Sequence, residues 1–181
     1  MPEGPEVKLY VDKLDRLYSK NRIKSVKVLS GRYAKKPIQD ISLIEGQKIL
    51  SVNCKGKFIW FELEKNIIFN TLGMTGSWSR VNKTHSRIRI NFSNDDHVFF
   101  NDIRNFGTLH IKRKDDLRKK LKTIGPDMLS NPPHNFIQIM RKKNNKNICD
   151  VLMKQNIVSG IGNYIKAESL WLSKNKPTCV Y

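Results

Sequence analysis

Residues 87–92, Arg-Ile-Arg-Ile-Asn-Phe, alternate polar and apolar side chains without interruption. Successive side chains of a β-strand point to opposite faces of a sheet, so strict alternation predicts a strand with one buried face. A helix would instead repeat its apolar residues every three or four positions. This segment therefore predicts a sheet that packs against a core on one side.

Further strand signals lie on both sides of this segment. Short apolar runs rich in β-branched and aromatic residues predict strands at 49–52, 58–63, 67–69 and 98–100. The polar stretches 64–66 and 94–96 have the composition of hairpin turns. Many short strands of this kind predict an antiparallel β-sandwich or barrel.

Helical patterns flank the predicted strands. Residues 3–18 carry apolar side chains at helical spacing, which predicts an amphipathic N-terminal helix. Gly125-Pro126 and Asn131-Pro132-Pro133 interrupt the chain, and helical periodicity returns beyond them. We therefore expect an α+β fold, with an N-terminal helix and antiparallel β-sandwich followed by an all-helical domain. The expected boundaries are 1–124 for the first domain, 125–133 for a hinge and 134–181 for the helical domain.

The charge balance narrows the class of partner. Lys and Arg number 34 against 16 Asp and Glu, which gives a net charge of +18. Such an excess favours a polyanion, because each phosphate that is neutralised releases condensed counterions. An anionic membrane surface is the competing partner, but no basic helix with a broad apolar face supports it. The chain also has no apolar run of membrane-spanning length and no signal segment, so we expect a soluble, intracellular protein.

The cysteines and histidines do not form metal-ligand motifs. Cys54, Cys149 and Cys179 lie far apart without a CxxC pair, and the four histidines show no ligand spacing. We expect reduced thiols and no bound metal.

The first six residues, Met1-Pro2-Glu3-Gly4-Pro5-Glu6, have two interpretations. Pro and Glu are favoured in the first turn of a helix, so these residues can simply begin one. Alternatively, removal of Met1 exposes the secondary amine of Pro2, whose pKa of roughly 8 leaves a neutral fraction near neutral pH. Such an amine can attack the C1′ atom of a sugar, with Glu3 moving protons and Glu6 in support. The spacing alone leaves both interpretations open.

Six segments of the chain form an ordered set: MPEGPE (1–6), CKGKFIWFEL (54–63), LGMTGSW (72–78), NDIRNFG (101–107), IGPDML (124–129) and ICDVLMKQNIVSGIGNYIKAESLW (148–171). In this order they resemble one family, the formamidopyrimidine-DNA glycosylase/endonuclease VIII (Fpg/Nei) enzymes of base-excision repair. Gly4 is more similar to the endonuclease VIII-like branch, and the composition suits a bacterial or giant-virus member.

The resemblance implies a role for single residues in these segments. Lys57 would reach a phosphate near the lesion, with Lys55 as its rival. Met74 would fill the space left by an everted nucleotide, Arg104 would pair with the orphaned base and Phe106 would wedge the stack. Each also has a purely structural interpretation: a solvated strand-edge lysine, a methionine that fills a gap in the core, a buried aromatic ring.

The Gly-rich turn before the last helical segment is expected to bind a phosphate. Backbone N–H groups at the start of a helix form an anion site, here at Gly162 and Asn163. The Asn163 side chain would add a donor, and Lys154 and Lys166 flank the turn. The family resemblance identifies the surrounding segment as a helix-two-turns-helix.

As a whole, the resemblance implies a bifunctional DNA glycosylase/AP lyase. It would remove oxidised bases, with pyrimidines and formamidopyrimidines favoured, through a Schiff base on Pro2 and β,δ-elimination. The partner would be double-stranded DNA with oxidised or abasic lesions, bound by a monomer without a cofactor. The alternative is a non-catalytic nucleic-acid-binding protein that uses only the helix-two-turns-helix.

Two departures from the family pattern affect the expected contacts with DNA. Thr71 stands where members often carry His or Arg, so a phosphate contact there is expected to be weak or absent. Members also usually continue into a C-terminal zinc finger or zincless equivalent, for which the 181 residues have no counterpart. Either the sequence is a fragment, or the finger is dispensable or replaced.

Overall fold

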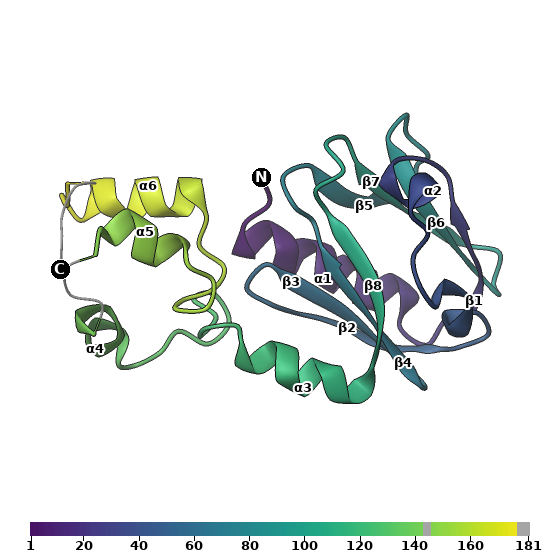
Figure 1. Ribbon diagram of the computed structural model, residues 1–181, viewed down its shortest axis with the longest axis horizontal. Coiled ribbons are helices and arrows are strands. Elements are labelled where there is room, and N and C mark those ends of the chain that lie inside the picture. The colour runs from purple at the N-terminus through teal and green to yellow at the C-terminus, as the bar shows by residue number, and fades with distance from the viewer. Residues whose placement is uncertain (143–145, 177–181) are drawn as a thin grey trace.

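The computed structural model describes residues 1–142 and 146–176. A β-sandwich with an N-terminal helix forms one body, and a group of short helices forms the other (Figure 1). The N-terminus lies near the junction of the two bodies (Figure 1). This arrangement confirms the predicted α+β fold.

The sandwich consists of two antiparallel four-stranded sheets. The first has the order β1-β6-β7-β5, with bounds Ile23–Val28, Ser86–Phe92, His97–Asp102 and Gly76–Ser79. The second has the order β2-β3-β4-β8, with bounds Ile49–Lys55, Phe58–Leu63, Asn66–Thr71 and Thr108–Arg113. Because the strands form two separate sheets, the fold is a sandwich and not a barrel.

The alternation in β6 has the predicted consequence for burial. Ile88, Ile90 and Phe92 are at most 1% exposed and lie in the main apolar core. Helix α1 (Gly4–Tyr18) contributes its apolar stripe to the same core, and the ring of Tyr18 stacks on Phe92 with centroids 4.5 Å apart. The N-terminal helix is thus held against the sandwich by its own apolar face.

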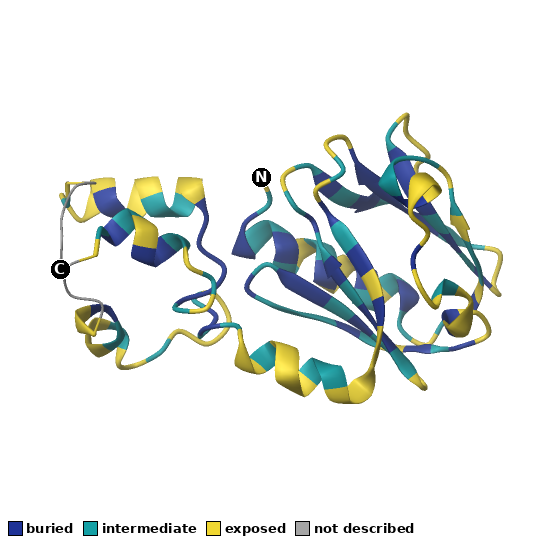
Figure 2. Cartoon of the chain, in the orientation of Figure 1, coloured by how far each residue is buried: buried dark blue, intermediate teal, exposed yellow. Residues whose placement is uncertain are grey.

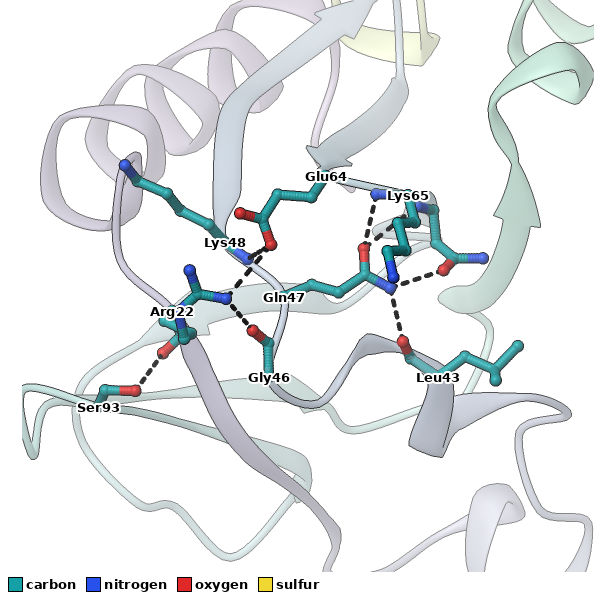
Figure 3. Close-up of polar contacts among 9 residues, drawn as sticks. Arg22, Leu43, Gly46, Gln47, Lys48, Glu64, Lys65 and Ser93 are labelled. Atoms are coloured by element: carbon teal, nitrogen blue, oxygen red, sulfur yellow. Dashed lines mark hydrogen bonds and ion pairs between the residues drawn. The ribbon is translucent and has the colours of Figure 1, made fainter.

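A polar cluster fixes the β3–β4 turn, at the strand ends remote from Phe58 and Thr71 (Figure 3). Buried Gln47 donates from Nε2 to the carbonyl of Leu43 at 2.6 Å and to Asn66 Oδ1 at 2.7 Å. Its Oε1 accepts from the backbone N–H of Lys65 at 2.8 Å. The predicted turn at 64–66 is therefore held by a side chain distant in sequence.

Several elements were not predicted from the sequence. Strands β1, β5 and β8 were missed, as were the short helices α2 (Arg32–Lys35) and η1 (Ile41–Ile44) and the longer α3 (Lys114–Lys122). Helix α3 has no buried residue and lies largely exposed beside the second sheet (Figure 2). An almost wholly polar helix lacks the apolar periodicity on which such predictions depend.

The second body contains α4 (Phe136–Arg141), α5 (Ile148–Met153) and α6 (Asn163–Leu172) around a separate apolar core. The predicted hinge is hydrogen-bonded to this body, since Gly125 N–H donates to the carbonyl of Gln155 at 2.9 Å. Ser159 N–H likewise donates to the carbonyl of Pro126 at 2.8 Å. The domain boundaries and the hinge role stay predictions. Within the described part of the chain, no helix is long and apolar enough to cross a membrane.

Candidate active site

A cavity of about 370 Å³ lies where the N-terminus meets the second sheet. It brings together Pro2, Lys57 and Met74, which come from three of the six segments singled out in the sequence. The remaining walls come from α1, the ends of β2 to β4, the end of α3 and the loop before α6. The lining residues are Met1, Pro2, Val7, Lys55, Lys57, Phe58, Thr71, Leu72, Gly73, Met74, Lys120, Ile124 and Gln155.

Glu3 connects the N-terminus to the helical body. Its side chain is 1% exposed, and its carboxylate accepts from the backbone N–H groups of Gly162 at 2.7 Å, Tyr164 at 2.9 Å and Ile165 at 3.2 Å. These groups form the N-terminus of α6, where the helix dipole favours a negative charge. Glu3 therefore acts as the anion at this helix start.

This contact corrects the predicted phosphate site. The N–H of Gly162, expected to face a DNA phosphate, is buried and already donates to Glu3. Asn163 is exposed, and its Oδ1 accepts from Lys166 Nζ at 3.2 Å. A backbone anion site is available to an external phosphate only where the protein leaves the donors free. A DNA contact at this turn is therefore left to Asn163, and it stays a prediction.

Gly162 permits the close approach of the two bodies. A Cβ atom at this position would overlap the Glu3 carboxylate and lie 2.6 Å from Lys57 Nζ. Gly4 on the opposite side is also tightly packed, since its N–H donates to the carbonyl of Gly160 at 2.8 Å. The absence of side chains here lets Glu3, Lys57 and α6 meet at one point.

Glu6 is held by two donors at the base of α1. Its Oε2 accepts from the backbone N–H of Glu3 at 2.9 Å, and the Tyr164 hydroxyl donates to its Oε1 at 2.8 Å. Burial raises the pKa of Glu6, but these hydrogen bonds outweigh burial and the pKa lies below its usual value. Burial and the hydrogen bond to Glu6 raise the pKa of Tyr164 to about 12. Glu6 is therefore ionised, and its carboxylate holds the backbone between Pro2 and α1 in place.

The structure distinguishes Lys57 from its rival Lys55. Lys55 Nζ donates to the carbonyls of Ile124 at 2.7 Å and Leu121 at 3.2 Å, so it caps the end of α3. Lys57 is half-buried beside Glu3; burial lowers its pKa, and the charges of Glu3 and Glu6 oppose that change. The ammonium of Lys55 is committed within the protein, whereas Lys57 lines the cavity and the missing side chain of Gly162 leaves room for its ammonium.

The three side chains expected to enter DNA lie on two neighbouring loops. Met74 is 39% exposed and Phe106 is 52% exposed, so neither fills the core as the structural interpretation required. The guanidinium of Arg104 lies over the Phe106 ring, 4.8 Å from its centroid. Met74 lines the cavity, whereas Arg104 and Phe106 stand outside it.

A buried carboxylate joins these two loops. Asp102 accepts from the Thr75 hydroxyl at 2.5 Å and from the N–H of Gly107 at 2.7 Å. Thr75 in turn accepts from the N–H of Arg104 at 3.0 Å. The loop after Asp102 is fixed further by Arg87, which donates to the carbonyls of Asp102 at 2.7 Å and Ile103 at 3.2 Å.

Sequence reasoning missed this network. The one available signal was an acidic residue directly at the end of an apolar strand, beside a Gly-containing loop. Thr71 is likewise committed within the protein, because its hydroxyl bonds to that of Thr108 at 2.8 Å. In residues 1–142 and 146–176 no cluster of three potential ligands is placed to hold a metal; Cys179 lies outside the described residues. The expectation of no metal stays a prediction.

Comparisons with known proteins agree on one family. The model of the formamidopyrimidine-DNA glycosylase N-terminal domain matches residues 1–109. A formamidopyrimidine-DNA glycosylase of Ureaplasma parvum is 34% identical over 98% of this chain and 69% of its own length. The MutM (Fpg) structure from Thermus thermophilus has a TM-score of 0.86 at 28% identity, covering 99% of this chain and 67% of that one. A MutM structure in complex with DNA containing carbocyclic 8-oxo-G has the same TM-score at 25% identity, over 99% and 72% of the two chains.

The fold, the junction at Glu3 and these matches lead to one assignment. The chain belongs to the formamidopyrimidine-DNA glycosylase family. It spans about two thirds of the length of curated relatives that it matches. Placement in the endonuclease VIII-like branch, and a bacterial or giant-virus source, stay predictions that depend on Gly4 and the composition.

Proposed function

We propose that this protein is a bifunctional DNA glycosylase/AP lyase of base-excision repair, with the amine of Pro2 as its nucleophile. The observation that carries the proposal is the placement of Pro2 in one cavity with Lys57 and Met74, directly next to the buried carboxylate of Glu3. The cavity thus brings a candidate nucleophile, a cation and an exposed apolar side chain together from three separate segments. They suit an everted nucleotide held against the N-terminus.

The residues support a covalent route. After removal of Met1, the Pro2 nitrogen attacks C1′ of the everted nucleoside and the bond from C1′ to the base breaks. Opening of the sugar ring then gives an iminium ion, which accepts electrons while the 3′ and 5′ phosphates leave in turn. The Glu3 carboxylate takes up the proton that the Pro2 nitrogen loses and passes it to the sugar ring oxygen as the ring opens, and Lys57 holds a phosphate.

The substrate we propose is double-stranded DNA with oxidised or abasic lesions. Relatives are named formamidopyrimidine-DNA glycosylases, and a structural neighbour binds DNA with carbocyclic 8-oxo-G. Within this class, we propose a preference for oxidised pyrimidines and formamidopyrimidines. Met74, Arg104 and Phe106 would occupy the space left in the duplex, and Asn163 would contact the backbone.

Borohydride trapping tests the proposal. We expect the Met-processed protein to form a reducible covalent adduct with a duplex that contains an abasic site, because the iminium intermediate is reduced to a stable amine. Pro2→Gly should lower the yield of adduct strongly, and the mass of the intact N-terminus gives the state of Met1. Pro5→Gly, three residues further on, is the matched control and should retain trapping.

The same experiment decides between the proposal and a non-catalytic DNA-binding protein. Tight binding without any adduct from the processed protein would support the latter and overturn the proposal. A panel of duplexes with single defined lesions, among them thymine glycol, formamidopyrimidine and 8-oxoguanine, measures the preference.

A further inference from the structure

We infer that Lys120, on α3, is a further phosphate-binding residue at the wall of the candidate active site. None of the six segments contains it. The inference rests on the proposed function in that the phosphate belongs to DNA bound at the same cavity. The inference goes beyond the proposed function because it adds a cation from α3, a helix that the sequence pattern did not predict.

The location of Lys120 is the first support. Lys120 lines the cavity that also contains Pro2, Lys57 and Thr71. Its ammonium lies 5.5 Å from the centroid of the Phe58 ring, and Phe58 pairs with Thr71 across strands β3 and β4. A cation over an aromatic face is attracted by the ring quadrupole, which holds Lys120 at this wall.

The free charge of Lys120 is the second support. Within residues 1–142 and 146–176, no carboxylate lies within 4.0 Å of its ammonium, whereas Lys114 on the same helix lies 3.6 Å from Glu62. Lys55 lines the same cavity but caps the end of α3 with its ammonium. In the described part of the chain, Lys57 and Lys120 are thus the two lysines on this wall whose ammonium groups are left for an anion.

The uncharged part of the wall gives the third support. The lining of the same cavity also includes Phe58, Thr71 and Leu72, and the Thr71 hydroxyl already bonds to Thr108. A phosphate at this wall therefore has Lys120 and Lys57 as its available donors. Two cations on one apolar wall suit a polyanionic backbone that passes along it, rather than a single small anion.

The salt dependence of DNA binding tests this assignment. The probe is a duplex with a tetrahydrofuran abasic analogue, titrated at a series of KCl concentrations. For Lys120→Gln we expect the slope of log K against log [KCl] to be less steep by about 0.9, the release expected for one phosphate contact. Lys120→Arg keeps the charge and should keep the wild-type slope.

Lys122→Gln is the matched control. It removes the same charge from the same exposed helix. Because Lys122 lies two positions after Lys120, its side chain points about 200° further round the helix axis. Equal slopes for Lys120→Gln and Lys122→Gln, or a wild-type protein that does not bind the probe, would overturn the inference. Borohydride trapping of the wild type on a natural abasic duplex separates this from the proposed function. If the wild type is trapped but Lys120→Gln keeps the wild-type slope, only the role of Lys120 is rejected. If the slope changes but the wild type is not trapped, only the proposed lyase activity is rejected.

Discussion

The carboxylate of Glu3 accepts a hydrogen bond of 2.7 Å from the backbone N–H of Gly162, 159 positions further along the chain. This contact links the residue next to the proposed nucleophile with the helix start of the second body. The chemistry at the N-terminus and the docking of the two bodies therefore depend on one side chain.

Replacement of Glu3 by Gln should lower both stability and activity. The amide keeps the size of the side chain but removes the charge that three backbone N–H groups of α6 donate to. We expect a loss of about 2 kcal/mol in the free energy of unfolding, as for hydrogen bonds to a charged group. Urea unfolding and base release from a lesion duplex measure the two effects. Glu168→Gln, at an exposed position of α6, is the control, and an equal loss there would contradict the assignment.

Replacement of Gly162 by Ala should disturb the site through packing alone. The added methyl group would overlap the Glu3 carboxylate and approach Lys57 Nζ. We expect a loss of about 1–3 kcal/mol in stability and reduced trapping on an abasic duplex. Gly46→Ala is the control, because Gly46 has a positive φ but open space around it. That variant should show backbone strain of about 1 kcal/mol with normal trapping; normal trapping by Gly162→Ala would contradict the prediction.

Replacement of Tyr164 by Phe should change the response to acid. The hydroxyl of Tyr164 donates to Glu6, whose pKa in the folded protein lies below its usual value. A lowered folded-state pKa gives stability that is present above the unfolded-state value and lost as the pH falls through the folded-state value. Without the hydroxyl the pKa of Glu6 rises toward its usual value, so the loss in the variant should begin at higher pH.

Urea unfolding at a series of pH values in the carboxylate range, roughly 6 to 3, measures this shift. The neighbouring groups that also act on Glu6 are the backbone of Glu3, the N-terminal amine and Lys57. Glu6→Gln supplies the control background, in which Tyr164→Phe should add no further pH dependence. A shift of equal size in that background would assign the effect to another group.

Replacement of Thr75 by Val should uncouple the two loops that carry Met74 and Phe106. The change removes the donor to Asp102 and the acceptor for the N–H of Arg104. We expect a cost of about 1–3 kcal/mol for the partners left unpaired. Release of an oxidised base should fall more than cleavage at a preformed abasic site, because an abasic nucleotide is easier to evert. Ser77→Ala in β5 is the control, and equal losses on both substrates would contradict a role in eversion.

The sequence by itself determined that the first body is built of antiparallel strands around an apolar core, because alternation in β6 and the short apolar runs each indicate burial. The pairing of the strands into two separate sheets became visible only in the structure. The sequence also determined the start of the site. Pro2 and Glu3 are recognisable by position, and the order of the six segments implied the family that the comparisons confirm. Helix α3 escaped because its residues face water on nearly every side, so no apolar period marks it.

Only the tertiary structure decided which groups are available for a ligand. Backbone N–H groups at a helix start look the same in sequence whether they face a phosphate or a carboxylate, and here Glu3 occupies those of Gly162, Tyr164 and Ile165. Lys55 and Lys57 are equally basic in sequence, but the carbonyls at the end of α3 engage Lys55 alone. Hydrogen-bond partners that are far apart along the chain have no local signal, so the free donors and cations of this site are set by packing.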